Sequence, residues 1–148
     1  MLFLRQIAAS PAYDVQGGTV SASILIADDD PNIVLALRFL MEKEGYKVTV
    51  ATDGDAALSV AAKTRPDVVL LDVMMPRRNG YDVCAAIRGD KTLADTRVVM
   101  LTAKGLTAER KNGLRAGADA YVIKPFATHD VLDQVRRLLP GTAPPSAG

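Results

Sequence analysis

The chain contains, at residues 68–76, the stretch VVLLDVMMP, in which four consecutive aliphatic residues lead directly to the carboxylate of Asp72. An aliphatic run of this length is typical of a strand that is covered on both faces of a sheet. A carboxylate at the end of such a strand is costly unless a cation, a proton or solvent compensates its charge. Asp72 is therefore the first candidate for a functional residue.

A second apolar strand also ends in acids. The stretch ILIADDD at residues 24–30 places Asp28, Asp29 and Asp30 directly after four apolar residues. If the two strands lie side by side, these acids and Asp72 meet at one end of a sheet. Two unit charges about 4 Å apart near a protein surface repel each other by roughly 4 kcal/mol at an effective dielectric constant of about 20. The pattern therefore favours a bound cation.

Strand and helix patterns alternate five times along the chain. We expect strands at about 23–27, 47–51, 67–72, 97–102 and 119–123, and helices at about 31–44, 54–64, 80–89, 107–116 and 128–139. This alternation is the signature of βαβ units, so the sequence predicts an α/β fold with a parallel sheet and helices on both of its faces. In such sheets ligands bind beyond the carboxyl ends of the strands.

The two ends of the chain differ from this pattern. Residues 1–22 carry turn-forming residues without a sustained hydrophobic period, which predicts a flexible extension, with a short ordered arm as the alternative. The segment PGTAPPSAG at residues 140–148 is predicted to be a disordered tail. The ordered domain is expected at residues 23–139. Because only the tail follows it, we expect no output domain.

The composition argues against several classes of protein. With 18 basic and 17 acidic residues the net charge is +1, which lacks the basic excess of a nucleic-acid-binding surface. No apolar run approaches the roughly 18 residues of a membrane span, and no secretory signal is recognisable. The single cysteine, Cys84, can form no internal disulfide. We therefore expect a cytoplasmic protein with no nucleic-acid or membrane partner.

Three carboxylates, a hydroxyl and an ammonium are expected at the carboxyl ends of the strands: Asp28, Asp29, Asp72, Thr102 and Lys124. The segments that carry them, in their order and spacing, resemble the receiver domain of two-component response regulators, the CheY-like family. The matching segments are ILIADDD at 24–30, LLDVMMP at 70–76, VVMLTA at 98–103 and YVIKPF at 121–126. The resemblance covers residues 23–139.

This resemblance implies a fold and a reaction. The fold would be a doubly wound, flavodoxin-like sheet of five parallel strands in the order 2-1-3-4-5, with a cis bond between Lys124 and Pro125. A carboxylate can accept a phosphoryl group as an acyl phosphate. By resemblance, Asp72 receives that group from the phosphohistidine of a histidine kinase, Lys124 pairs with one phosphoryl oxygen and Thr102 hydrogen-bonds another.

The resemblance also implies a magnesium site. Mg²⁺ takes oxygen ligands, often one or two carboxylates together with phosphate and water. Asp29 and Asp72 would supply two ligands, and Asp28 would act directly or through water. The backbone carbonyl of Met74 would add another, which leaves the side chain at that position free to vary.

A switch and a partner surface follow from the same resemblance. Tyr121 matches the family's switch aromatic, which would turn inward as Thr102 moves toward the phosphoryl group. The fourth helix, the fifth strand and the fifth helix would then present an altered surface to a downstream protein. The basic residues Arg77 and Arg78 are interpreted as a solvated face, with a partner surface as the alternative.

Simpler explanations cover several other residues. Asp30 is predicted to cap the helix that follows it. Cys84 is predicted to be a core residue, and His129 to be exposed on the last helix. Met74 and Met75 are expected to divide between exposure and packing.

We interpret the chain as a single-domain response regulator that catalyses only its own phosphorylation and dephosphorylation. One alternative is a relay intermediate that passes the phosphoryl group to a histidine phosphotransfer protein. Another is an aspartyl-phosphate hydrolase, which by family pattern would need a general-acid aspartate where Met74 stands. A degenerate receiver that only binds partners is the third, and the complete set of polar residues argues against it.

Overall fold

A five-stranded parallel sheet forms the centre of the computed structural model, which describes residues 13–15, 18–20, 22–103 and 116–139. Its strands are β3 (Ser23–Ala27), β4 (Lys47–Ala51), β5 (Val68–Asp72), β6 (Arg97–Thr102) and β7 (Ala120–Ile123). They lie in the order β4-β3-β5-β6-β7, and every neighbouring pair is parallel. This is the predicted order 2-1-3-4-5, so the fold expected from the sequence is confirmed.

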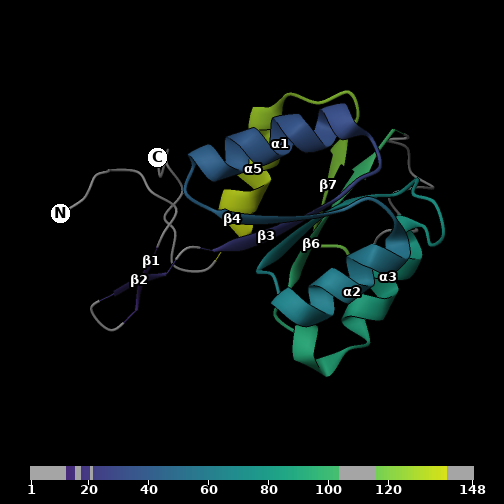
Figure 1. The fold of residues 1–148 in the computed structure, drawn as a ribbon, viewed down its shortest axis with the longest axis horizontal. Coiled ribbons are helices and arrows are strands. Elements are labelled where there is room, and N and C mark those ends of the chain that lie inside the picture. The colour runs from purple at the N-terminus through teal and green to yellow at the C-terminus, as the bar shows by residue number, and fades with distance from the viewer. Residues whose placement is uncertain (1–12, 16–17, 21, 104–115, 140–148) are drawn as a thin grey trace.

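Helices cover both faces of this sheet. They are α1 (Pro31–Lys43), α2 (Gly54–Thr64), α3 (Gly80–Arg88) and α5 (Thr128–Leu138), with a short 3₁₀ helix, η1 (Lys91–Leu93). Figure 1 shows α1 and α5 on one face and α2 and α3 on the other. The helix predicted at 107–116 lies outside the described residues except for residue 116. None of the helices in the described ranges is both long and apolar enough to cross a membrane.

Polar caps start three of the helices close behind the strand ends. The Asp30 side chain accepts hydrogen bonds from the first backbone N–H groups of α1, as predicted, and Pro31 occupies the first turn. Asp53 caps α2 and Asn79 caps α3 in the same way. At the other end of α1, Gly45 adopts a φ of 96°, a conformation that residues with a Cβ rarely take. The three N-terminal caps fix where the helices begin after the chain leaves the carboxyl edge of the sheet.

Two aliphatic cores lie on the two faces of the sheet. Along β3, Ile24 and Ile26 belong to one cluster, while Leu25 and Ala27 belong to the other. This alternation follows from the two-residue period of a strand. All five residues of β5 are buried, as expected for a strand with helices on both sides. The sheet therefore gives a rigid base to the side chains that follow its strands.

A short hairpin lies within the segment predicted to be a flexible extension. β1 (Tyr13–Val15) pairs with β2 (Gly18–Val20) in antiparallel register. Both interpretations of residues 1–22, a flexible extension and a short ordered arm, stay predictions. Strands of three residues are too short to establish a hydrophobic period, so the sequence pattern did not reveal them.

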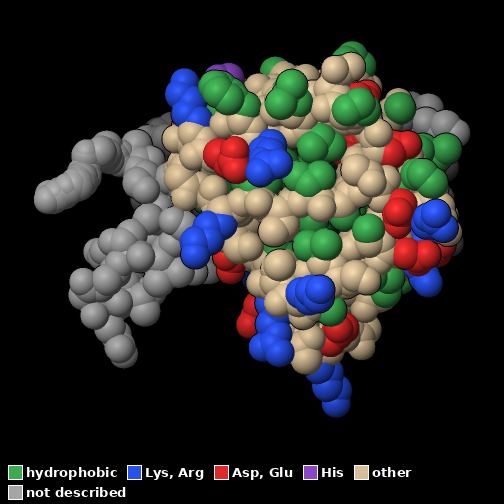
Figure 2. Space-filling model, in the orientation of Figure 1, with side chains coloured by type: hydrophobic (Ala, Val, Ile, Leu, Met, Phe, Trp, Pro, Cys, Tyr) green, Lys and Arg blue, Asp and Glu red, His purple; other side chains and the backbone are tan. Residues whose placement is uncertain are grey.

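The outer face of α1 carries exposed apolar side chains. Leu35 and Phe39, one helical turn apart, are both largely exposed. Figure 2 shows hydrophobic side chains along the edge of the molecule where α1 lies in Figure 1. Single exposed apolar residues are ordinary in proteins, and this pair lies on one side of the helix because residues four apart share a face.

Candidate functional site

The acids that follow β3 and β5 meet at the carboxyl edge of the sheet. These strands are hydrogen-bonded neighbours, and Ala27 lies in register with Leu71. The next residues, Asp28 and Asp72, therefore stand side by side. Carboxylate oxygens of Asp28, Asp29 and Asp72 all lie within 4.8 Å of one another. The convergence predicted from the sequence is thus observed.

The three acids differ in their exposure to solvent. Asp28 is 0% exposed and Asp72 is 4% exposed, whereas Asp29 is exposed. The Asp28 carboxylate is held in place by the backbone N–H of Asp30, which donates to Oδ1 at 2.9 Å. The cluster therefore has two acids in the protein interior and one that faces solvent.

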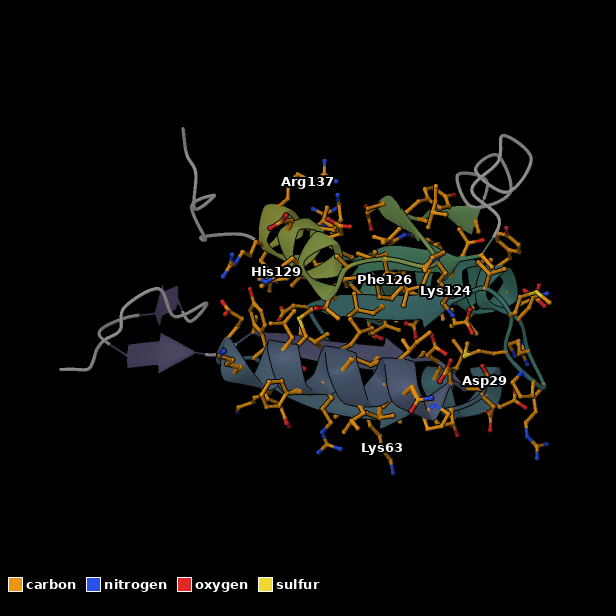
Figure 3. All side chains as sticks on the ribbon, turned by 90° about the horizontal axis from the view of Figure 1, so that it is seen from above. Asp29, Lys63, Lys124, Phe126, His129 and Arg137 are labelled. Atoms are coloured by element: carbon orange, nitrogen blue, oxygen red, sulfur yellow. The ribbon has the colours of Figure 1, made fainter. Side chains whose placement is uncertain are left out.

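Lys124 reaches the two buried acids from the far edge of the sheet. Its Nζ donates to Asp28 Oδ2 at 3.1 Å and to Asp72 Oδ1 at 3.2 Å. Figure 3 shows Lys124 and Asp29 at the same end of the domain. The residue follows β7, its backbone N–H donates to the carbonyl of Thr102, and its bond to Pro125 is cis, as the resemblance implied. Four charged side chains, those of Asp28, Asp29, Asp72 and Lys124, therefore meet at one edge of the sheet.

Asp72 lies in an environment that disfavours its charge. Burial raises the pKa of Asp72, and the negative charge of Asp28 adds to the effect, so that the pKa reaches about 6 although Lys124 and the Met74 N–H oppose it. For Lys124, burial alone would lower the pKa, but the hydrogen bonds and charges of Asp28 and Asp72 outweigh it and raise the pKa. Lys124 therefore remains an ammonium at neutral pH.

The charges of the cluster suit a divalent cation. Among the described residues, three carboxylates face one ammonium, which leaves two negative charges in excess when all are ionised. Carboxylate oxygens are hard ligands of the kind that Mg²⁺ and Ca²⁺ take, and the set contains no soft sulfur ligand. The residues present therefore fit the magnesium site that the resemblance implied.

Thr102 and Tyr121 lie on the neighbouring strands. Thr102 ends β6 and is buried, and the residue before it, Leu101, is in register with Asp72. Tyr121 lies on β7 in register with Met100 and packs against the core on the side of α2 and α3. Thr102 thus follows the residue that pairs with Asp72. Thr102 itself is in register with Ile123 of β7, two residues after Tyr121.

The loop after Asp72 contributes main-chain groups. The backbone N–H of Met74 donates to Asp72 Oδ1 at 3.2 Å. The Met74 side chain is 70% exposed and that of Met75 is buried, which confirms the predicted division between them. The carboxylate of Asp72 is therefore oriented by the loop that its own strand enters.

Cys84 and His129 lie away from the acidic cluster, one in the core and the other on the surface. Cys84 is buried in α3, and burial raises the pKa of its thiol to about 11, so it is a core residue as predicted. His129 is exposed on α5, also as predicted (Figure 3). Neither residue belongs to the acidic cluster.

Two glycines at the site were not recognised from the sequence as functional. A Cβ on Gly80 would lie 2.8 Å from Cα of Val73 and closer still to the carbonyl oxygen of Asp72. Gly54 makes a similar approach to Arg78. In the sequence both glycines appear only as the first residues of predicted helices, at about 54–64 and 80–89.

A doubly wound sheet that gathers acids and a lysine at its carboxyl edge defines the class of receiver domains. The family model described as the response regulator receiver domain matches residues 24–136. The chain belongs to this family.

The relatives and solved structures agree with this assignment. The response regulator MprA of Mycobacterium sp. (strain KMS) is 46% identical over 121 residues, which are 82% of this chain and 52% of the relative. The chain thus spans about half the length of the curated relatives it matches. The chemotaxis protein CheY4 of Vibrio cholerae has a TM-score of 0.77 and 32% identity, over 81% of this chain and 100% of that one.

A further neighbour bears on the metal. The receiver domain of a sensor histidine kinase from Pseudomonas aeruginosa has a TM-score of 0.74 and 29% identity, over 80% of this chain and 98% of that one. Its structure contains a magnesium ion coordinated in the active-site cleft.

Proposed function

We propose that this chain is a Mg²⁺-dependent phosphoacceptor, which takes a phosphoryl group onto Asp72 from the phosphohistidine of a histidine kinase or a histidine phosphotransfer protein. The observation that carries the proposal is the environment of Asp72. Its buried carboxylate lies in the acidic cluster and 3.2 Å from the Lys124 ammonium. Carboxylates with perturbed pKa values and a specific charged partner are typical of reactive sites.

The reaction would be a displacement at phosphorus. A carboxylate oxygen of Asp72 attacks the phosphorus atom, the bond from phosphorus to the imidazole nitrogen breaks, and the nitrogen keeps the electron pair. Phosphoryl transfer depends mainly on positioning and on compensation of charge. Lys124 would donate to a phosphoryl oxygen, since its Nζ lies 3.2 Å from Oδ1 of the attacking carboxylate. The Thr102 hydroxyl would donate to a second oxygen.

The chain's own oxygen atoms would hold the metal. We assign the ligands to Asp29 and Asp72, to Asp28 directly or through water, and to the backbone carbonyl of Met74. When bound, Mg²⁺ would compensate the negative charge of the acids and of the phosphoryl oxygens. The magnesium in the Pseudomonas receiver supports this assignment.

Phosphorylation would change the conformation of a surface that binds another protein. We propose that Thr102 moves toward the phosphoryl group and that Tyr121 turns inward, a two-state response to a new charge. The affected surface would comprise the fourth helix, β7 and α5. Its partner would be a downstream protein in the cytoplasm, and onward transfer to a histidine phosphotransfer protein is the alternative output. With a net charge of +1, we propose no nucleic-acid contact by this domain.

The experiment is phosphorylation by a small donor. The full chain is incubated with Mg²⁺ and acetyl phosphate and examined by intact-mass spectrometry. We expect one added phosphoryl group per chain, and none when the incubation contains EDTA in place of Mg²⁺. Asp72→Asn should abolish the adduct, while Asp133→Asn, which changes an exposed carboxyl of α5, should retain it.

Two results would contradict this role. An adduct that persists in Asp72→Asn would place the acceptor elsewhere. Turnover of many equivalents of a phosphomonoester without an accumulated adduct would favour a hydrolase, although the exposed thioether of Met74 has no proton to give at the position where a general acid is needed.

A further inference from the structure

The loop between β5 and α3, residues 73–79, rests on the N-terminus of α2. The backbone N–H of Gly54 donates to the carbonyl of Pro76 at 3.2 Å. The same carbonyl accepts from the backbone N–H of Arg78 at 2.8 Å. One carbonyl of the loop therefore closes a turn within the loop and also ties that turn to the neighbouring helix.

Gly54 allows the two backbones to approach closely. A Cβ at this position would lie 2.5 Å from Cβ of Arg78, 2.7 Å from its carbonyl carbon, and closer still to its carbonyl oxygen. Cβ atoms in proteins essentially never come within 3.0 Å of such neighbours. Two of these three atoms belong to the main chain, so no side-chain rotation can make room. Alanine at position 54 must displace the loop or the start of α2.

Ion pairs flank this contact. Arg78 Nε lies 3.1 Å from Asp55 Oδ1, and Arg77 Nε lies 3.5 Å from Asp53 Oδ2. The two arginines interpreted as a solvated face therefore have specific partners on α2. Three of the four side chains are exposed, Asp53 being the exception, and ion pairs with exposed members contribute little to stability. The main-chain contact at Gly54 is thus the dominant interaction between the loop and the N-terminus of α2.

A second close contact holds the other end of the loop. The backbone N–H of Gly80 donates to the carbonyl of Val73 at 2.9 Å, and the backbone of Gly80 packs against Asp72. Between the two contacts, the buried side chain of Met75 joins the same hydrophobic cluster as Ala57 of α2. Met74 therefore lies in a short span that is fixed on both sides.

We infer that the N-terminus of α2, through the contact at Gly54, is a positioning element for the metal-binding loop. It holds the Met74 backbone where its carbonyl can serve as a ligand. The inference rests on the proposed function, because the metal site is part of that proposal. Gly54 is a positioning residue, since it acts through the loop and does not touch the metal.

The test measures Mg²⁺ affinity in the full chain without any phosphodonor, by isothermal titration calorimetry. Gly54→Ala should bind Mg²⁺ about tenfold more weakly than the wild-type chain, since loss of the groups that orient metal ligands typically costs 10- to 100-fold. Thermal unfolding in EDTA gives the stability of each variant separately.

Two glycine variants serve as controls. At Gly89 a Cβ would meet its nearest atom at 3.5 Å, an ordinary contact, so Gly89→Ala should leave stability and affinity unchanged. Gly117 has a φ of 95° and precedes β7 at the opposite end of the sheet. Gly117→Ala should lower the unfolding temperature through backbone strain and leave Mg²⁺ affinity unchanged. It therefore separates a loss of positioning from a general loss of stability.

The outcomes distinguish the inference from the function beneath it. A folded Gly54→Ala chain with tenfold weaker binding, beside a destabilised Gly117→Ala chain with wild-type binding, supports the inference. A folded Gly54→Ala chain with wild-type affinity overturns it and leaves the proposed function standing. A wild-type chain that binds no Mg²⁺ overturns both.

Hydrogen exchange decides the case if Gly54→Ala does not fold. In the wild-type chain, Mg²⁺ at ten times its dissociation constant should slow exchange of the Gly54 amide about tenfold, because the opened loop would not bind the metal. The Gly89 amide, which donates to the carbonyl of Ala85, is the internal reference and should not change. Unchanged exchange at Gly54 under saturating Mg²⁺ would overturn the inference.

Discussion

Both ends of the sheet carry carboxylates with positively charged partners, but the two ends differ in how fully the negative charge is compensated. At the amino end, Asp119 accepts from Arg88 Nη2 at 2.6 Å and from the Val98 N–H at 2.8 Å, and Arg97 lies 3.6 Å away. At the carboxyl end, Asp28 and Asp72 share the single ammonium of Lys124 within the described part of the chain. The amino end is a compensated network, whereas the carboxyl end leaves negative charge available for a cation.

This contrast separates structural ion pairs from a site. Arg88 also donates to the carbonyls of Thr96 and Gly117, at 2.7 and 2.9 Å, so it joins α3 to the segments before β6 and β7. Charged groups with complete sets of partners stabilise a fold. Buried carboxylates without enough partners cost stability, and proteins tend to keep such arrangements where they have a function.

The largest expected effect is at the compensated end. Arg88→Ala removes three hydrogen bonds and leaves Asp119 with fewer partners, so we expect the free energy of unfolding to fall by about 3 kcal/mol. Chemical denaturation measures it. Arg38→Ala breaks an exposed pair with Glu42 and should change stability by less than about 0.5 kcal/mol. Equal effects of the two substitutions would remove the contrast between a part-buried network and a surface pair.

At the uncompensated end, removal of a charge should stabilise the metal-free fold. The pKa of Asp72 is about 6 in the folded chain against an ordinary 3.8, so its stability contribution is complete below pH 3.8 and is lost as the pH rises through 6. A difference of roughly two units corresponds to about 3 kcal/mol. We therefore expect Asp72→Asn to gain about 2 kcal/mol at pH 8 in EDTA, since its buried amide offsets part of the benefit.

The pH dependence checks the cause of that gain. The stability of Asp72→Asn relative to the wild-type chain should be highest at pH 8 and should fall by about 3 kcal/mol toward pH 3.5, where the aspartate is largely protonated in both the folded and the unfolded state. Asp133→Asn, at an exposed position, should match the wild-type chain at both values. A loss of stability in Asp72→Asn at pH 8 would contradict the account of uncompensated charge.

A smaller effect is expected at the exposed acid. Asp29 is not within ion-pair distance of Lys124, so Asp29→Asn should leave the metal-free stability unchanged. It should nevertheless weaken Mg²⁺ binding about tenfold, which corresponds to about 1.4 kcal/mol. Titration calorimetry measures the affinity, with Asp133→Asn as the control for loss of a remote charge. Wild-type affinity in Asp29→Asn would exclude this residue from the metal site.

Local patterns in the sequence were sufficient to predict the sheet and the edge at which the acids gather. The run VVLLD gave strand β5 to within one residue because a strand covered on both faces must be continuously apolar. Asp28 and Asp72 could be placed together because parallel neighbours end at the same edge. The roles of Thr102, Lys124 and Met74 came from family resemblance, and their catalytic use stays a prediction.

Contacts between distant segments could not be predicted. Arg88 and Asp119 are 31 residues apart, and no period relates them. The approach of Gly54 to Arg78 is set by how α2 and the loop pack, which the composition of neither segment reveals. The hairpin of β1 and β2 was missed because its strands are too short for a pattern. Periodicity reports which face of an element is buried, and it does not report which backbones touch.

The central claim is that Asp72, among the acids gathered at the carboxyl edge, is the group that accepts phosphate when Mg²⁺ is present. The most direct measurement is borohydride reduction of the phosphorylated chain, which converts a phosphoaspartate into homoserine, followed by peptide sequencing in a mass spectrometer. We predict homoserine at position 72 alone, and only in samples phosphorylated with Mg²⁺. Homoserine at position 28 or 29, or at position 72 without the metal, would contradict the account.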